Sequence, residues 1–142
     1  MKKTINIPEG IVGNERFIVT YEDTIAGQVS EDLPQVLGTF ILTKWMEQIA
    51  GYMVQSYLLD GDLTVGAQID IEHVAPSPVG MNISIESSLI KVDGISLHFN
   101  IVAYDDVELI ARAKHKRTVI SRPLLERIIK RKSGVKDTHP KQ

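Results

Sequence analysis

An apolar run over residues 36–59, free of proline, constrains this chain more strongly than any other feature of its sequence. Its length and composition predict one long helix, which ends at the Asp-Gly-Asp turn of residues 60–62. The run is long enough to span a membrane, but Lys44 and Glu47 lie near its middle, and each central charge costs about 2.5–3.5 kcal/mol on insertion scales. We therefore predict a helix buried in a protein core and no membrane segment.

One β-prone run precedes the predicted helix and four follow it. They cover residues 15–21, 63–74, 81–92, 95–105 and 107–120. Asp93-Gly94 lies between two of these runs and predicts a two-residue hairpin loop. Strands clustered after a single helix indicate an α+β fold with an antiparallel sheet. Such a sheet must bury one face, and the long helix is the element able to cover it.

The remaining segments are shorter and more polar. Residues 22–35 contain Asp, Gly, Ser and Pro and are predicted to form a loop. Ser121 followed by Pro123 is typical of a helix N-terminus, so a short helix is expected over residues 124–131. The predicted organisation is a single domain over residues 1–132 and a polar, mobile tail over residues 133–142.

Composition and motifs narrow the classes of function. The chain has 142 residues, enough for one domain, with 16 basic and 18 acidic side chains and a formal charge of -2. Nucleic-acid-binding domains are usually strongly basic, so no nucleic-acid partner is expected. The sequence contains no phosphate loop, dinucleotide glycine fingerprint, nucleophile elbow or His-Glu-x-x-His motif, so neither a metal nor a cofactor is expected.

The cysteine count and the N-terminus bear on the compartment. The chain has no cysteine, which excludes disulfides, thiolate metal sites and a cysteine nucleophile and fits a reducing cytoplasm. The first ten residues include two lysines but no apolar run behind them, so no signal peptide is expected there. We therefore expect a cytoplasmic protein.

The predicted helix carries a carboxylate on its apolar side. On a helical wheel at about 100° per residue, Thr39, Thr43 and Glu47 cluster on one side, away from the solvated side with Lys44 and Gln48. A buried carboxylate is costly unless it is paired or used in chemistry. Glu47 is therefore either a structural residue that caps a loop or pairs with an arginine, or a catalytic residue.

Two strand-like runs direct further polar side chains toward the same core. In the run after the helix, strict alternation sends one set of residues inward: Val65, Ala67, Ile69, Ile71 and His73. In the last run, His115 and Arg117 share a face with small apolar residues and are further candidates for a site. A lone core histidine is more often structural than catalytic. A carboxylate and a histidine that point into one core can nevertheless serve acid–base or nucleophilic chemistry.

Four short segments carry a likeness to a known family. They are VLGTF at 36–40, WME at 45–47, EHVAPSPVG at 72–80 and KHKRTVI at 114–120. The spacing Thr39…Glu47…His73, followed by the His-x-x-x-x-Pro-x-Gly turn, is the most specific part. From about residue 13 to residue 120 the chain resembles the hotdog acyl-CoA thioesterases related to fluoroacetyl-CoA thioesterase.

The resemblance implies a fold, a reaction and a set of residues. The fold is the hotdog, an antiparallel sheet wrapped around one long central helix, and the activity is hydrolysis of a small or medium acyl-CoA by a homodimer with its site at the dimer interface. The family's catalytic residues fall on Thr39, Glu47 and His73. The carboxylate attacks the thioester or activates water, the histidine assists proton transfer, and the threonine orients the carboxylate. No cofactor is implied, since coenzyme A is part of the substrate.

Both the residue patterns and the family resemblance predict residues of the substrate-binding surface. Gly66 matches the family's glycine ahead of the histidine, and His115, Arg117 and Leu33 are assigned with it to substrate binding. Residues 30–34 read Ser-Glu-Asp-Leu-Pro, where the specialised fluoroacetyl enzyme has phenylalanines, so its narrow substrate preference is not implied. Two alternatives on the same fold stay open, namely a non-catalytic acyl-CoA or acyl-carrier binding protein and an enoyl-CoA hydratase or dehydratase.

Overall fold

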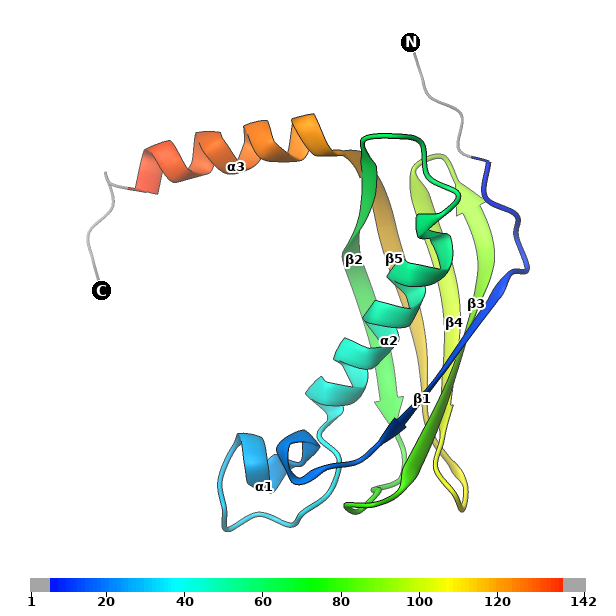
Figure 1. Ribbon diagram of the computed structural model, residues 1–142, viewed down its shortest axis with the longest axis vertical. Coiled ribbons are helices and arrows are strands. Elements are labelled where there is room, and N and C mark those ends of the chain that lie inside the picture. The colour runs from blue at the N-terminus through cyan, green and yellow to red at the C-terminus, as the bar shows by residue number, and fades with distance from the viewer. Residues whose placement is uncertain (1–5, 137–142) are drawn as a thin grey trace.

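In the computed structural model, which describes residues 6–136, a five-stranded antiparallel sheet curves around one long helix (Figure 1). In chain order the elements are β1 (Val12–Ile18), η1 (Tyr21–Asp23), α1 (Ile25–Gln28), α2 (Thr39–Gln55), β2 (Asp62–His73), β3 (Asn82–Asp93), β4 (Ser96–Tyr104), β5 (Leu109–Ser121) and α3 (Arg122–Lys136). The strand order across the sheet is β1-β3-β4-β5-β2, and every neighbouring pair is antiparallel. The predicted α+β class and the order of its main elements are confirmed.

The core lies between α2 and the concave face of the sheet. The buried side of α2 consists of Leu42, Trp45, Met46, Ile49, Ala50 and Val54. Fully burying a large apolar side chain contributes about 1.5–3 kcal/mol, so this face alone holds the helix on the sheet. At one edge Trp45 stacks on Phe17 of β1 with ring centroids 4.2 Å apart. Gly13 allows β1 to approach the helix closely, because a Cβ there would lie 3.1 Å from that of Met53.

The long helix is shorter than the predicted 36–59 at both ends. At its start, Leu37 donates its N–H to the carbonyl of Ser77 and Gly38 donates to that of Asp23, so these residues bond to other segments and precede the helix. At its end, the amide of Tyr57 bonds three residues back to Val54, which tightens the chain into a turn before residue 61. Both ends are set by contacts that the apolar pattern does not show.

The predicted loop over residues 22–35 contains the short helices η1 and α1. Thr24 caps α1, since its hydroxyl accepts a hydrogen bond from Gly27 at 3.0 Å and donates to the carbonyl of Tyr21 at 2.6 Å. Its side chain is fully buried. Before these helices, β1 begins at Val12 rather than at residue 15. In both places tertiary contacts order residues that look like turn formers in the sequence.

The hairpin between β3 and β4 differs from the prediction by one residue. Asp93 pairs with Ser96, so the two-residue loop is Gly94-Ile95 rather than Asp93-Gly94. Gly94 has φ +62° and Ile95 has a negative φ, a combination typical of a type II′ turn with glycine first. The hairpin itself is confirmed.

The edge strand β2 contains a bulge at Ala67. The register with β5 skips this residue, and an extra residue in one strand reverses the alternation of faces. The even-numbered residues before the bulge and the odd-numbered residues after it therefore face α2. The predicted inward face was correct for Ile69, Ile71 and His73 and wrong for Val65 and Ala67.

The last helix is longer than the predicted 124–131. Ser121 caps it as expected, since its hydroxyl accepts the N–H of Leu124 at 3.2 Å. The helix continues through Lys136 and so includes the first residues of the predicted tail, and the rest of that tail, 137–142, lies outside the described residues. None of the helices between residues 6 and 136 is long and apolar enough to cross a membrane.

Candidate active site

Thr39 and His73 form a pair where the start of α2 meets the end of β2. The hydroxyl of Thr39 lies 2.8 Å from Nδ1 of His73. The histidine is half-buried, and its Nε2 is buried without a hydrogen-bond partner. Burial lowers the pKa of the His73 imidazole below its ordinary value of 6.5, so at neutral pH the ring is uncharged and able to accept a proton.

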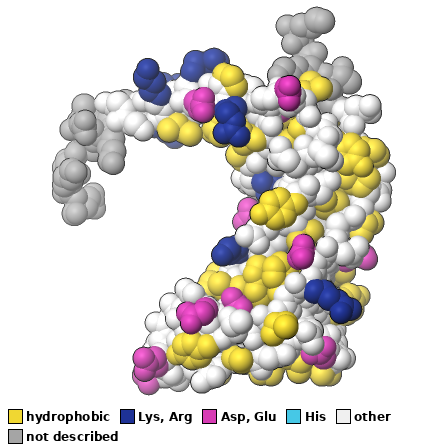
Figure 2. Space-filling view, in the orientation of Figure 1, with side chains coloured by type: hydrophobic (Ala, Val, Ile, Leu, Met, Phe, Trp, Pro, Cys, Tyr) yellow, Lys and Arg dark blue, Asp and Glu magenta, His cyan; other side chains and the backbone are white. Residues whose placement is uncertain are grey.

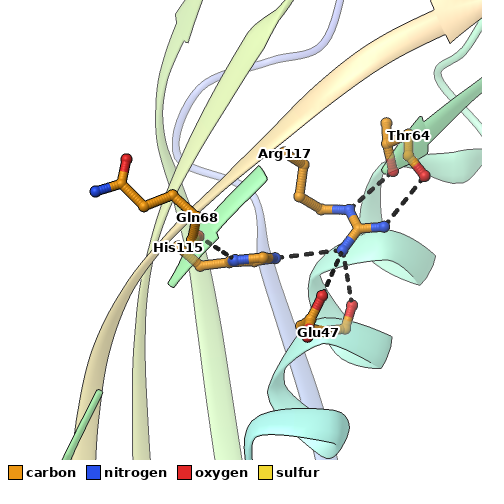
Figure 3. Close-up of polar contacts among 5 residues, drawn as sticks. All are labelled: Glu47, Thr64, Gln68, His115 and Arg117. Carbon is orange, nitrogen blue, oxygen red and sulfur yellow. Dashed lines mark hydrogen bonds and ion pairs between the residues drawn. The ribbon is translucent and has the colours of Figure 1, made fainter. Parts of the chain in front are cut away.

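A second cluster surrounds the guanidinium of Arg117, near the middle of α2 (Figure 3). Its Nε donates to the hydroxyl of Thr64 at 2.9 Å, and Nη2 donates to the carbonyl of the same residue at 3.2 Å. Nη1 lies 3.9 Å from a carboxylate oxygen of Glu47. The Arg117 side chain is only 11% exposed, whereas that of Glu47 is 42% exposed. A fixed, buried cation thus holds a carboxylate that is open to solvent at the sheet edge.

His115 connects this cluster to β2. Nη1 of Arg117 lies 3.2 Å from Nε2 of His115, and Nδ1 of His115 lies 2.8 Å from the carbonyl of Gln68. Arginine can only donate and a carbonyl can only accept, so these contacts fit the neutral tautomer with its proton on Nδ1. Burial is the main cause that lowers the pKa of His115, which agrees with an uncharged ring beside the arginine.

Gly66 provides the space for the Glu47 carboxylate. A Cβ at this position would collide with an oxygen of Glu47 and lie 3.6 Å from Cε1 of His115. The backbone of Gly66 is not in a left-handed conformation, so glycine is needed here for room rather than for its φ. The assignment of Gly66 to the site, made from resemblance, thus has a steric reason in this chain.

We predict that Gly66→Ala displaces the carboxylate of Glu47 and leaves the fold intact. The atom in the way is the end of a flexible side chain, so that side chain moves and the sheet does not. Misplacing a catalytic group by about 1 Å can cost up to roughly 10²-fold in rate, so kcat/KM should fall by about 10- to 100-fold with little change in Tm. Gly134→Ala is the matched control, because a Cβ there meets nothing within 4 Å. Unchanged kinetics for Gly66→Ala would contradict this placement of Glu47.

The two clusters do not meet within one chain. Thr39 and Glu47 are eight residues apart on α2, which is about 12 Å along the helix axis at 1.5 Å per residue. Thr39 contacts His73 rather than Glu47, so the expected orientation of the carboxylate by the threonine does not occur inside the protomer.

Some of these residues stand out in the sequence and others do not. The sequence pattern predicted Glu47, His115, Arg117 and His73. It did not predict Thr64 or the carbonyl of Gln68, which bond to the second cluster. The signal for Thr64 was hidden, because the bulge that turns it inward is not visible in an alternating pattern. Leu33 lies exposed in the loop between α1 and α2, and its contact with substrate stays a prediction.

The outer face of the sheet carries a different polar surface. A hollow of about 320 Å³ there is lined by Asp70, Lys114 and Lys116 among others. Asp70 stands opposite Lys114 across β2 and β5, so opposite charges alternate on this face. Both lysines therefore point away from the core. In the part of the chain that the structure describes, no three His, Cys, Asp or Glu side chains gather to hold a metal ion.

A five-stranded antiparallel sheet that curves around one long central helix is the arrangement of a hotdog-fold protein. The sequence pattern of the fluoroacetyl-CoA-specific thioesterase family matches residues 19–123, more than half of the chain. The protein therefore belongs to this family.

Individual relatives agree with this assignment. A fluoroacetyl-CoA thioesterase of Streptantibioticus cattleyicolor is 29% identical over 89 residues, which cover 63% of this chain and 64% of that relative, less than two thirds of its length. A solved fluoroacetyl-CoA thioesterase superposes with a TM-score of 0.83 at 24% identity, over 89% of this chain and 98% of that one. A Thermus thermophilus thioesterase superfamily member gives a TM-score of 0.89 at 20% identity, over 96% of this chain and 100% of that one. The hotdog fold is confirmed.

Proposed function

We propose that this protein hydrolyses small or medium acyl-CoA thioesters in the cytoplasm. The observation that carries the proposal is the half-exposed carboxylate of Glu47, held beside Gly66 and a buried arginine in a chain of this family. A solved relative was determined with fluoroacetate and CoA bound, which supports an acyl-CoA substrate here. Water and the thioester give a carboxylic acid and free coenzyme A, and no cofactor is consumed.

In this reaction the described residues take complementary roles. The carboxylate of Glu47 attacks the thioester carbonyl or takes a proton from the attacking water. His73 is neutral at pH 7 and supplies the proton acceptor, and Thr39 holds its ring through the bond to Nδ1. Arg117 stays protonated and fixes the carboxylate in place.

The free edge of β2 supports a homodimer. β2 has twelve residues and pairs on one side only, with β5. Long, open strand edges pair readily with another chain. Two copies that join their β2 edges about a two-fold axis continue the sheet and set their α2 helices side by side and antiparallel.

Such a dimer brings the two clusters together. If the axis passes near Ile69 and Asp70, Gly66 stands opposite the partner's His73. In each chain the carboxylate of Glu47 lies beside Gly66. Each site would then combine Glu47 of one protomer with the Thr39–His73 pair of the other, which removes the 12 Å separation found inside one chain.

Mixing two inactive variants tests this shared site. Glu47→Gln and His73→Ala protomers each lose activity alone, but a mixed dimer keeps one site with both groups intact. Random exchange of equal amounts should restore about one quarter of wild-type activity, since half of the dimers are mixed and each holds one intact site. A site built within one chain restores nothing, because each protomer then lacks one of its own groups.

A panel of acyl-CoA substrates with detection of the released thiol tests the activity itself. We expect turnover of short and medium acyl chains by the wild-type protein and its loss in Glu47→Gln. Tight binding of acyl-CoA without thiol release would favour the non-catalytic alternative. Hydration of an enoyl-CoA at a higher kcat/KM than thioester cleavage would favour the hydratase.

The loop between α1 and α2 predicts broad selectivity. Residues 30–34 contain one large apolar side chain, Leu33, which is 37% exposed. Apolar pockets separate substrates that differ by a methylene by only about 1–3 kcal/mol, so a loop without aromatic filler is not expected to discriminate one fluorine strongly. The ratio of kcat/KM for fluoroacetyl- and acetyl-CoA should be modest, with butyryl- and hexanoyl-CoA also accepted. A large preference for the fluorinated substrate would place the discriminating residues elsewhere.

A further inference from the structure

α3 projects from the body of the protomer like an arm. It begins where β5 ends, beside the start of β2, and extends past the β2 edge (Figure 1). Arg122 at its start donates its N–H to the carbonyl of Gly61 at 2.7 Å, which fixes the root of the helix. Figure 2 shows a concave space between α3 and the α1 end of the molecule. It lies beside the part of the molecule where Figure 1 draws α2 and β2.

The arm has one apolar side that its own protomer leaves largely uncovered. Leu124, Leu125, Ile128 and Ile129 fall within about 140° of the helical wheel, and Lys130 lies on the opposite side. Leu124 is 41% exposed and Ile129 is 53% exposed. A helix of 15 residues is marginal in water without a packed apolar face, so this side needs a partner surface.

The charge of α3 is complementary to one segment of the same chain. Between residues 122 and 134 there are five basic side chains and one acidic side chain, Glu126. Between Arg16 and Lys44 there is no lysine or arginine, and the four charged residues are Glu22, Asp23, Glu31 and Asp32. The loop within this segment also exposes Val29 at 66% and Leu33 at 37%.

Within one protomer these two surfaces lie at opposite ends of the molecule, but the proposed dimer brings them together. The root of α3 is at the start of β2, because Ser121 pairs with Asp62. With Gly66 opposite the partner's His73, the start of β2 comes level with the partner's Ser77. In each chain Ser77 bonds to Leu37 at 2.8 Å, so the α1–α2 loop lies beside it.

We propose that α3 of each protomer docks across the second copy and covers residues 21–38 of that copy. This range is the part of the acidic stretch that contains all four carboxylates. The apolar side of α3 packs on Val29 and Leu33 of the partner subunit. The basic residues on or beside that side, Arg131 and Lys132, face the carboxylates around them, whereas Lys130 points away. Because that loop precedes Thr39 and carries Leu33, the arm of one chain closes the acyl end of the other chain's site. This inference rests on the proposed dimer and adds the surface that α3 recognises.

Inter-subunit cross-linking tests the contact directly, because the full chain has no cysteine of its own. A Val29→Cys chain and an Ile129→Cys chain, tagged to differ in mass, are mixed, allowed to exchange subunits and treated with a short bismaleimide. We expect a mixed cross-linked product, and none of it when Lys130→Cys replaces Ile129→Cys. Val29 and Ile129 are both exposed in the protomer, so each cysteine variant should fold.

A second measurement tests the energetic role. Leu124→Ser together with Ile129→Ser should raise the dimer dissociation constant by about 10-fold or more and raise KM, whereas Lys130→Ser should change neither by more than about 2-fold. High salt should weaken the wild-type dimer, as expected for facing opposite charges.

The outcomes separate this inference from the proposed function. A dimer that releases thiol but gives no mixed cross-link overturns the docking of α3 and leaves the thioesterase in place. Co-sedimentation of the wild-type protein with anionic vesicles, lost in the double serine variant, would assign the arm to a lipid surface and also overturn it. A mixed cross-link in a protein that releases no thiol supports the arm and removes the thioesterase.

Discussion

Replacing Glu47 with Gln is expected to abolish most of the thioesterase activity while the protein stays folded. Glutamine keeps the shape of the side chain and can still accept a hydrogen bond from Arg117, but it carries no charge to attack a carbonyl or take a proton from water. Acid–base roles are worth about 10²–10⁴-fold and loss of a nucleophile costs more, so kcat should fall by at least about 10²-fold. The ion pair of Glu47 is half-exposed, so Tm should change little.

Steady-state thiol release with saturating acyl-CoA measures this effect, and thermal unfolding of the same sample shows that the fold is intact. Glu86→Gln is the matched control, because Glu86 is exposed on the outer face of β3, opposite Asn14. Near-normal turnover by Glu47→Gln would make Glu47 a structural partner of Arg117, which is the alternative that the sequence leaves open. A loss of activity that is accompanied by a matching fall in Tm would also indicate a structural role for Glu47.

The fold could be predicted because its pattern is carried by residues close together in sequence. The apolar periodicity that defines α2, and the alternation in β3, β4 and β5, correspond to the faces that are buried. The predictions that were wrong concern segments whose structure depends on residues distant in sequence. Residues 36–38 look helical but bond to Asp23 and Ser77, and α1 is ordered by the capping hydroxyl of Thr24.

The site was predicted in part for the same reason. Glu47 and Arg117 each stand out as a charge on an otherwise apolar face, which alternation and the helical wheel reveal. Thr64 stands out in neither way, since its inward direction follows from the bulge at Ala67. No sequence pattern showed that Thr39 contacts His73 instead of Glu47, because that depends on where α2 lies along β2.

The second large effect concerns His73 and the pH dependence of the reaction. Burial lowers the pKa of His73, so the proton acceptor is lost only when the pH falls below the ordinary histidine value of 6.5. In the wild-type protein kcat/KM should therefore rise with pH through a pKa below 6.5 and then level off. The same shift makes the folded state less stable as the pH falls through that pKa, because the unfolded chain binds the proton more tightly.

His73→Ala should remove the acid limb of this profile and lower kcat/KM by about 10²–10⁴-fold, since the mechanism then has no base at that position. Two other histidines provide controls. His98 pairs opposite Lys116 on the outer face, so His98→Ala should leave the profile unchanged. His115 also has a pKa lowered by burial, but it bonds to Gln68 and Arg117 and not to Thr39, so His115→Gln should keep the acid limb whatever its rate. If His73→Ala keeps the limb and loses only stability, His73 is a structural residue of the core and the proton acceptor lies elsewhere.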